Sequence, residues 1–235
     1  MIKTLINALE GIDKTLNEKQ IKQFQYYYSL LIEWNEKMNL TAITEPKEVA
    51  IKHFFDSATF LKYVKVKKGA KIIDVGTGAG FPGIPLKILQ PDIELTLLDS
   101  LNKRLNFLNE VCNVLDIKAE IIHKRAEDGG RQVDLREKFD IATSRAVANM
   151  NTLCEYLMPY VKVGGNMVAM KGRNGKDELT SAKDAIAKLG GRINFCNEFA
   201  LPTGDERTII VVDKIKPCPK TYPRQTAKIK NNPLQ

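Results

Sequence analysis

Strand-like and helix-like patterns alternate along most of this chain, from about Ala70 onward. Short β-branched runs are followed by longer segments with helical spacing, which is typical of parallel strands joined by crossover helices. We therefore predict an α/β fold of the doubly wound type with strands near residues 71–75, 94–98, 119–122, 139–142, 165–170, 193–199 and 208–213. The helices between them are predicted near residues 82–90, 101–115, 150–161 and 176–189.

The residues before the first predicted strand have a helical pattern. Asn17 and Gln20 have the spacing of a capping box, and apolar residues then recur every three or four positions. A second helix is predicted from Glu45 to about Tyr63, with Thr44 as its cap. These helices are expected to cover the sheet.

The chain divides by pattern into three parts. Residues 1–68 are expected to form a helical extension packed on the sheet, and residues 69–213 the sheet domain. Residues 214–235 contain basic residues and prolines but no acidic residue, which predicts an extended basic C-terminal arm.

A glycine-rich turn follows the first predicted strand. Gly76, Gly78 and Gly80 alternate there, and residues without a Cβ can adopt positive φ angles and lie close against a ligand. The helix that follows would present unpaired N–H groups. Asp99 ends the second predicted strand, where a carboxylate could accept hydrogen bonds from a ribose diol. Together these features predict an adenosine-type ligand.

Two ligands remain compatible with this turn. Residues 78–83 satisfy the dinucleotide pattern G-x-G-x-x-G, with Asp99 at about the expected distance of ~20 residues, which favours a NAD-dependent oxidoreductase. In that class the first glycine follows the strand directly, whereas residues 74–77 intervene here. Asp74 would repel phosphates and attract a ligand that carries an ammonium group. We therefore favour S-adenosylmethionine and keep NAD as the alternative.

Composition narrows the function further. The net charge of +8 and the pI near 9.2 favour a polyanionic partner. The chain has four cysteines without a C-x-x-C pair and only two histidines. These are too few suitably spaced ligands for a zinc site, so no metal is expected. No uncharged run exceeds 12 residues, well short of a membrane span, and no secretory signal is recognisable at the start. We expect a cytoplasmic protein.

The order of motifs resembles that of a class I S-adenosylmethionine-dependent methyltransferase, and more narrowly the RsmG (GidB) family. The resemblance covers nearly the whole chain and rests on residues 39–41, His53 with Asp56-Ser57, residues 74–83, 98–100, 125–127, 144–148 and 222–224. It implies a Rossmann-like, seven-stranded, mostly parallel sheet. It also implies methyl transfer from S-adenosylmethionine to N7 of a guanine in bacterial 16S ribosomal RNA.

The resemblance implies a set of cofactor-binding residues: Gly76, Gly78, Phe81, Asp99, Ala126, Glu127 and Arg145. Glu127 would border the adenine, unless it is an exposed loop carboxylate. Arg145 could bind the methionine carboxylate or an RNA phosphate, or form a structural salt bridge. No catalytic residue is assigned, and Arg145 is the best candidate near the site of methyl transfer. Guanine N7 carries no proton, so no general base is required.

The candidate RNA contacts are His53, Lys171, Arg173, Arg224 and Lys228. His53 and Asp56 share a helical face, and a pair that only stabilises the helix is the alternative. The predicted partner is 16S ribosomal RNA, either free or within a 30S particle, and the protein is expected to be a monomer. A basic RNA-binding module with a vestigial cofactor pocket is a further alternative.

Overall fold

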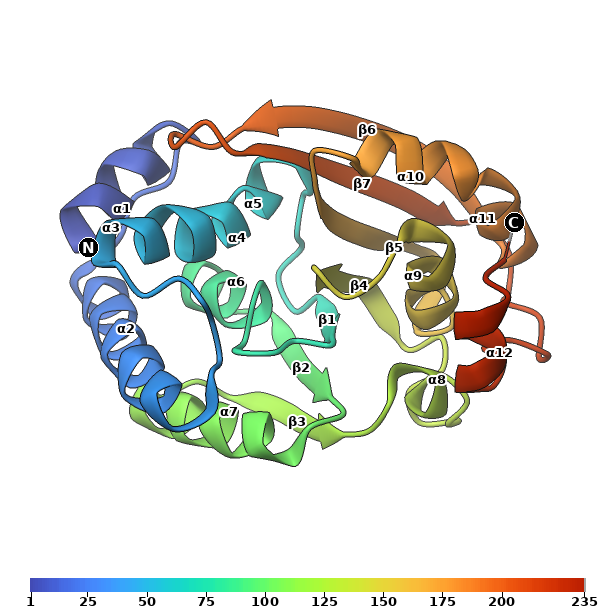
Figure 1. Ribbon diagram of the computed structural model, residues 1–235, viewed down its shortest axis with the longest axis horizontal. Helices are drawn as coiled ribbons and strands as arrows, with labels where there is room; N and C mark the ends of the chain where they lie inside the picture. The colour runs from blue at the N-terminus through green and yellow to red at the C-terminus, as the bar shows by residue number, and fades with distance from the viewer. Residues whose placement is uncertain (235) are drawn as a thin grey trace.

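The computed structural model describes residues 1–234, and its centre is one seven-stranded sheet. The strand order is β3-β2-β1-β4-β5-β7-β6, and β7 runs antiparallel to β5 and β6 while the other neighbouring pairs are parallel (Figure 1). The strands are β1 (Lys71–Val75), β2 (Glu94–Asp99), β3 (Ala119–His123), β4 (Phe139–Arg145), β5 (Val161–Gly172), β6 (Gly191–Ala200) and β7 (Glu206–Lys214). The predicted α/β fold and all seven strands are confirmed.

Alternate residues of the buried strands enter different cores. In β1, Ile73 joins a core formed with the helices of one face, whereas Ile72 joins a smaller core that contains Phe60. This division follows from the two-residue period of a strand, and a strand covered on both faces is apolar almost throughout. The helices between the strands are α6 (Gly83–Leu89), α7 (Asn102–Val114), α8 (Ala126–Gly129), α9 (Met150–Leu157), α10 (Gly175–Ser181) and α11 (Lys183–Lys188).

The N-terminal extension is helical and shares its core with the sheet domain. Its elements are α1 (Ile2–Glu10), α2 (Glu18–Met38), α3 (Pro46–Val49), the π-helical η1 (Ala50–Phe55), α4 (Asp56–Ala58) and α5 (Phe60–Tyr63), coloured blue to cyan in Figure 1. The capping box of Asn17 and Gln20 is confirmed. Phe54 of η1 and Phe81 lie in the same aromatic group, with ring centroids 6.1 Å apart.

The predicted single helix over residues 45–63 is wrong in two respects. Its cap is Glu45, whose carboxylate accepts hydrogen bonds from the backbone N–H groups of Lys47 and Glu48, so Thr44 is not the cap. The helix also widens into the π-helical turn of η1. Such turns are frequent at functional sites, and this one carries His53, whose ring stacks on Phe81.

The C-terminal residues do not form the extended arm that their composition suggested. They contain α12 (Thr226–Asn231) and pack on the body of the protein. Cys218, Ile229 and Leu234 are buried, whereas Lys228 and Lys230 are exposed. Arg136 also binds the backbone carbonyls of Cys218, Pro219 and Tyr222. A few buried apolar side chains thus pack this basic, proline-rich segment against the rest of the protein.

Two absences hold for residues 1–234. None of their helices combines the length and apolar character needed to cross a membrane. Their histidine, cysteine, aspartate and glutamate side chains do not gather in a group of three or more that could hold a metal ion.

Candidate functional site

The glycine turn lies at the carboxyl end of β1, between that strand and α6. Gly76 has φ of +70°, and a Cβ placed on it would lie 2.6 Å from Cγ2 of Val147. Only glycine fits this close approach and this left-handed conformation. Gly78 also has a positive φ of +61°, but a Cβ placed on it would have no atom within 4 Å.

Asp74 braces the turn from inside. It is fully buried, and its Oδ2 accepts hydrogen bonds from Thr77 Oγ1 at 2.7 Å and from the Gly83 N–H at 2.9 Å. Burial raises the pKa of Asp74 to about 6, while these two hydrogen bonds act in the opposite direction. The expected role of Asp74 at an open mouth of the loop is therefore not what the structure shows, because its contacts are with its own loop.

Asp99 ends β2 and is held beside the turn. Its Oδ2 accepts a hydrogen bond from the Gly78 N–H at 2.9 Å, and its Oδ1 accepts one from the Leu101 N–H at 3.0 Å. Arg104 Nη1 also donates to Oδ2 at 3.4 Å. A carboxylate has about four lone-pair sites, so the remaining accepting capacity is at Oδ1. The sequence correctly placed Asp99 next to the glycine turn, because β1 and β2 are parallel neighbours whose carboxyl ends share one edge.

A cavity of ≈ 320 Å³ opens at this edge, and we call it the first cavity. Four of the expected cofactor-binding residues line it: Gly76, Asp99, Ala126 and Glu127. Its wall also contains Leu101, Val147, Tyr156, Thr226 and Lys230, which the sequence did not single out. Thr226 and Lys230 belong to α12, and Thr226 is 99 positions from Glu127 along the chain, so no local spacing could reveal them.

Glu127 is enclosed and contacts the C-terminal segment. Its side chain is buried, and its Oε1 accepts a hydrogen bond from the hydroxyl of Thr226. Tyr160 donates to the backbone carbonyl of Ala126 at 2.6 Å and fixes the turn that carries both residues. The alternative of an exposed loop carboxylate at Glu127 is therefore wrong.

Phe81 and Arg145 do not line the first cavity. Phe81 is buried in a stack between Tyr27 and His53, with ring centroids at 5.4 Å and 4.7 Å. The Arg145 guanidinium lies 4.9 Å from the Phe81 ring centroid and pairs with Asp56, with Nη1 3.1 Å from Oδ2. The structure thus separates Phe81 and Arg145 from the four expected cofactor contacts that line the first cavity, and Gly78 does not line that cavity either.

A second cavity of ≈ 370 Å³ lies at the same edge of the sheet. Charged or polar side chains that line it include His53, Asp56, Arg145, Lys171 and Arg207, and its apolar wall includes Ile43, Met170, Phe199 and Ile209. The segment that follows β4 separates the two cavities, because Arg145 and Ala146 line the second whereas Val147 lines the first. Ala146 has a φ of +58°, and such strain in a residue other than glycine is typical of functional sites.

His53 is neutral in this environment. Its Nε2 lies 2.8 Å from Thr41 Oγ1, and its Nδ1 lies 3.3 Å from Nη2 of Arg145. Burial, followed by the charge of Arg145, lowers the pKa of His53 to about 3. Because a guanidinium only donates hydrogen bonds, Nδ1 is the acceptor and Nε2 carries the proton that Thr41 accepts.

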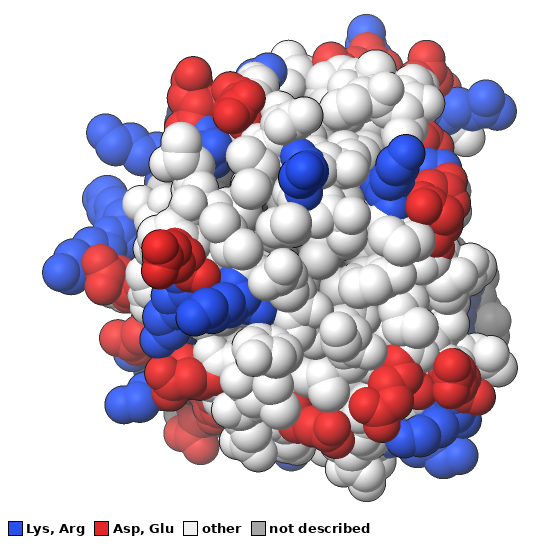
Figure 2. Space-filling view, turned by 90° about the vertical axis from the view of Figure 1, so that its left-hand side faces the viewer, with Lys and Arg blue, Asp and Glu red and all other residues white. Residues whose placement is uncertain are grey.

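The other expected RNA contacts fall into two groups. Arg173 and Lys228 are exposed. Lys171 is almost buried and pairs with Glu178 at 2.7 Å, and Arg224 pairs with the buried Glu155 at 2.7 Å. Basic and acidic side chains are interspersed on the face formed by α1 and α2, so the positive charge does not gather there (Figure 2).

Sequence comparison relates the chain to one family. A family model, GidB, described as rRNA small subunit methyltransferase G, matches residues 20–210. A protein named ribosomal RNA small subunit methyltransferase G from Clostridium perfringens (strain SM101 / Type A) is 52% identical over 230 residues, which is 97% of this chain and 96% of that relative. A protein of the same name from Lactobacillus johnsonii is 54% identical over 223 residues and 93% of each chain.

Solved structures share the fold at low sequence identity. The YcgJ protein from Bacillus subtilis superposes with a TM-score of 0.55 at 11% identity, over 70% of this chain and all (100%) of that chain. TYW2 from M. jannaschii, solved in complex with AdoMet, has a TM-score of 0.51 at 13% identity, over 63% of this chain and 71% of that chain. These likenesses concern the fold alone.

Proposed function

Since this chain belongs to the rRNA small subunit methyltransferase G family, we propose that it transfers a methyl group from S-adenosylmethionine to N7 of a guanine in 16S ribosomal RNA. The observation that carries this proposal is the first cavity, where the glycine turn, Asp99 and Glu127 meet at one edge of the sheet. Ligands of open α/β sheets bind at this edge.

The first cavity fits an adenosine-type ligand in size and chemistry. Its volume of ≈ 320 Å³ lies at the lower end of the range of ~300 to 1,000 Å³ for ligand pockets. Asp99 would accept a hydrogen bond from a ribose hydroxyl with its remaining lone pair at Oδ1, and Gly76 and Gly78 would approach the methionine part. Ala126 and Glu127 would border the adenine. Phe81 and Arg145 would then act from outside this cavity, rather than by direct contact with the cofactor.

The reaction places few demands on the protein. S-adenosylmethionine supplies an electrophilic methyl group, so the N7 lone pair forms the new bond to carbon while the carbon–sulfur bond breaks and its electrons return to sulfur. No proton leaves N7, which agrees with a His53 that is a poor base because its pKa is lowered to about 3. The residues of the two cavities therefore have to align the reactants and exclude water.

The RNA contacts belong to the exposed basic residues. Arg173 and Lys228 are free to bind phosphate, and Lys230 lies at the rim of the first cavity. We assign Lys171 and Arg224 instead to holding the protein together, because each already pairs with a carboxylate. We further propose a cytoplasmic monomer, with residues 69–213 as the methyltransferase domain, residues 1–68 as its helical extension and residues 214–235 as its C-terminal segment.

The test is transfer of tritiated methyl groups to 16S ribosomal RNA, offered as free transcript and as 30S particles. Label mapped to one guanine by primer extension after cleavage at 7-methylguanine supports the proposal. Label at another atom or in another RNA contradicts it, and no label favours a vestigial cofactor pocket. Equal transfer to both substrates would show that free RNA suffices, and transfer to particles alone would show that the 30S particle is required.

A binding experiment separates the cofactor alternatives. S-adenosylhomocysteine should bind and NAD should not, because β1 ends at Val75 and Gly76 and Thr77 still separate it from the dinucleotide pattern that begins at Gly78. Binding of NAD alone would favour an oxidoreductase.

A further inference from the structure

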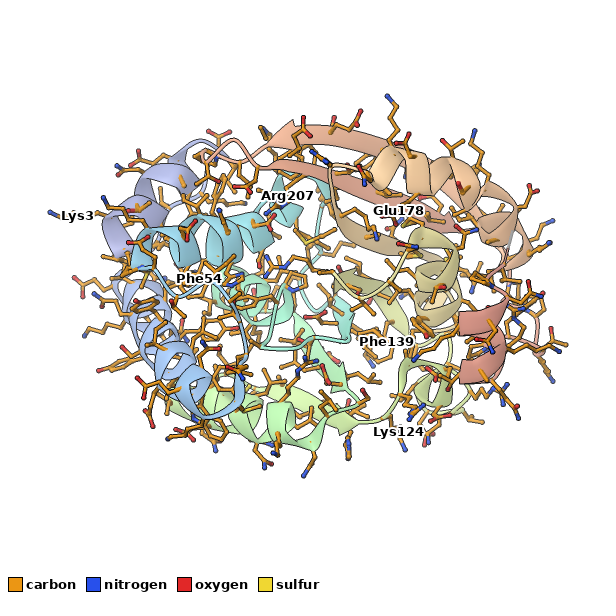
Figure 3. The ribbon with its side chains drawn as sticks, viewed as in Figure 1. Lys3, Phe54, Lys124, Phe139, Glu178 and Arg207 are labelled. Carbon is orange, nitrogen blue, oxygen red and sulfur yellow. The ribbon has the colours of Figure 1, made fainter. Side chains whose placement is uncertain are left out.

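The second cavity contains a carboxylate with one unused oxygen. Asp56 is only 3% exposed, and its Oδ2 accepts hydrogen bonds from Arg145 Nη1 and Arg207 Nε, both at 3.1 Å. Its Oδ1 is buried and has no hydrogen-bond partner among residues 1–234. Figure 3 shows Arg207 reaching from β7 toward the helices of the N-terminal extension. A buried acceptor without a donor is unfavourable by itself, so a ligand that donates a hydrogen bond would satisfy it.

Arg145 also retains a donor beside this carboxylate. Its Nη1 and Nη2 donate to Asp56, to His53 and to the backbone carbonyls of residues 52 and 53. None of these hydrogen bonds uses the Arg145 Nε–H. Arg145 and Asp56 both line the second cavity and therefore place an N–H donor next to a carboxylate in its wall.

The order of these groups matches one edge of guanine. Val147 lines the first cavity, Arg145 two positions earlier lines the second, and Asp56 pairs with Arg145 there. The edge of guanine that follows N7 carries O6, which accepts, and then N1–H, which donates. Adenine carries a donor and then an acceptor in the corresponding positions. The apolar side chains of Met170, Phe199 and Ile209 line the same cavity and suit a flat base.

We propose, building on the function proposed above, that the second cavity holds the acceptor guanine and that Asp56 and Arg145 select it. Asp56 Oδ1 accepts the N1–H, Arg145 donates to O6, and N7 is left facing the first cavity. When N7 gains the methyl group the base becomes cationic and N1–H becomes more acidic. The hydrogen bond to Asp56 then strengthens as the transition state forms, which is the condition for an interaction to accelerate a reaction.

The test compares RNAs that differ by single atoms at the methylated position. Inosine keeps O6, N1–H and N7, whereas 2-aminopurine keeps N7 but lacks O6 and N1–H. Each enzymatic kcat/KM is divided by the rate of N7 methylation of the same RNA with dimethyl sulfate, which removes differences in intrinsic reactivity. The wild-type protein should methylate inosine within about tenfold of guanosine and 2-aminopurine about a hundredfold more slowly or worse. Equal normalised rates for guanosine and 2-aminopurine would overturn the proposal.

The Asp56→Asn variant tests the residue itself. A carboxamide can donate to the unprotonated N1 of 2-aminopurine, so the preference for guanosine should narrow by about tenfold or more. A general loss of structure would lower both rates and leave their ratio unchanged, and an unchanged ratio overturns the role of Asp56. Affinity for S-adenosylhomocysteine should stay within about twofold, because Asp56 lies outside the first cavity.

Two comparisons keep the test decisive. Asp92→Asn alters an exposed aspartate near the amino end of β2 and should keep the wild-type ratio. If Asp56→Asn does not fold, the wild-type rates on the three RNAs decide alone. If the wild-type protein does not methylate RNA that contains guanosine, the proposed function fails rather than the assignment of Asp56.

Discussion

Arg224 of the C-terminal segment binds Glu155 of α9 through a two-pronged ion pair. Arg224 Nε lies 2.9 Å from Oε1 and Nη2 lies 2.7 Å from Oε2, while the Arg224 backbone N–H also donates to Oε1 at 2.6 Å. The Glu155 carboxylate is 0% exposed. The tail motif that suggested an RNA contact therefore has a partner inside the protein, and this partner holds α12 against the first cavity.

Arg224→Ala should destabilise the protein strongly. It leaves the buried Glu155 carboxylate without its counter-charge, and breaking such a pair is unfavourable by about 3 to 5 kcal/mol. Urea unfolding monitored by circular dichroism measures this loss. Arg173→Ala is the matched control, because Arg173 is exposed, and its free energy of unfolding should change by less than about 0.5 kcal/mol. A loss below about 1 kcal/mol for Arg224→Ala would contradict the anchoring role.

Gly76→Ala should be worse tolerated than Gly78→Ala. Both positions have positive φ, which costs a residue with a Cβ about 1 to 2 kcal/mol. Only at Gly76 would the new Cβ also lie 2.6 Å from Val147. Urea unfolding should show the larger loss for Gly76→Ala, and a Val147→Ala background should remove most of the difference. Equal losses in the wild-type background would show that Val147 moves aside freely.

Asp99→Asn should weaken cofactor binding. The amide has one acceptor oxygen fewer than the carboxylate, which already binds the N–H groups of Gly78 and Leu101 and pairs with Arg104. Losing a hydrogen bond to a charged group is unfavourable by about 1.5 to 3 kcal/mol, so affinity for S-adenosylhomocysteine should fall roughly 10-fold to 100-fold by titration calorimetry. Asp116→Asn, on the exposed loop after α7, serves as control. An affinity within twofold of wild type would remove Asp99 from the site.

His53→Gln should make the protein less sensitive to acid. In the folded protein the pKa of His53 is lowered to about 3 from an ordinary value of 6.5. Between these values the unfolded chain binds the proton and the folded one does not, so stability falls as the pH drops below about 6.5. At pH 5 this amounts to about 2 kcal/mol.

Urea unfolding at pH 8 and pH 5 measures this effect. The variant should lose about 2 kcal/mol less than the wild type between these two values. Asp74, whose pKa is raised to about 6, changes stability in the opposite direction, but it is present in both proteins and cancels in the comparison. The same pH dependence in both proteins would contradict a buried, neutral His53.

Local patterns in the sequence predicted the strands of the sheet well. The alternation of apolar runs and helical periods indicated all seven strands at their observed positions along the chain, because burial on both faces of a parallel strand leaves a clear apolar run. The pattern failed over residues 45–63 and at the C-terminus. A π-helical turn differs from an α-helix only in pairing each carbonyl with the N–H five rather than four residues on. The helix α12 is held by distant partners such as Glu127 rather than by its own sequence.

The candidate site shows the same division. Gly76 and Asp99 were found from sequence because adjacent parallel strands bring their carboxyl ends together whatever else the chain does. The positions of Phe81 and Arg145 could not be found in this way. The side chain of Phe81 stacks on His53, and that of Arg145 pairs with Asp56. The positions of His53 and Asp56 depend on how the N-terminal extension packs over the sheet.

The order of strands and helices, the glycine turn and the acidic residue beside it can all be read from the chain, since these depend on backbone geometry and periodic burial. Only the folded molecule shows that the carboxyl edge holds two cavities, that Arg145 faces the second, and that α12 closes the first. Ion pairs and hydrogen bonds between residues 89 to 151 positions apart fix those features, and contacts at such separations leave no periodic trace in one chain.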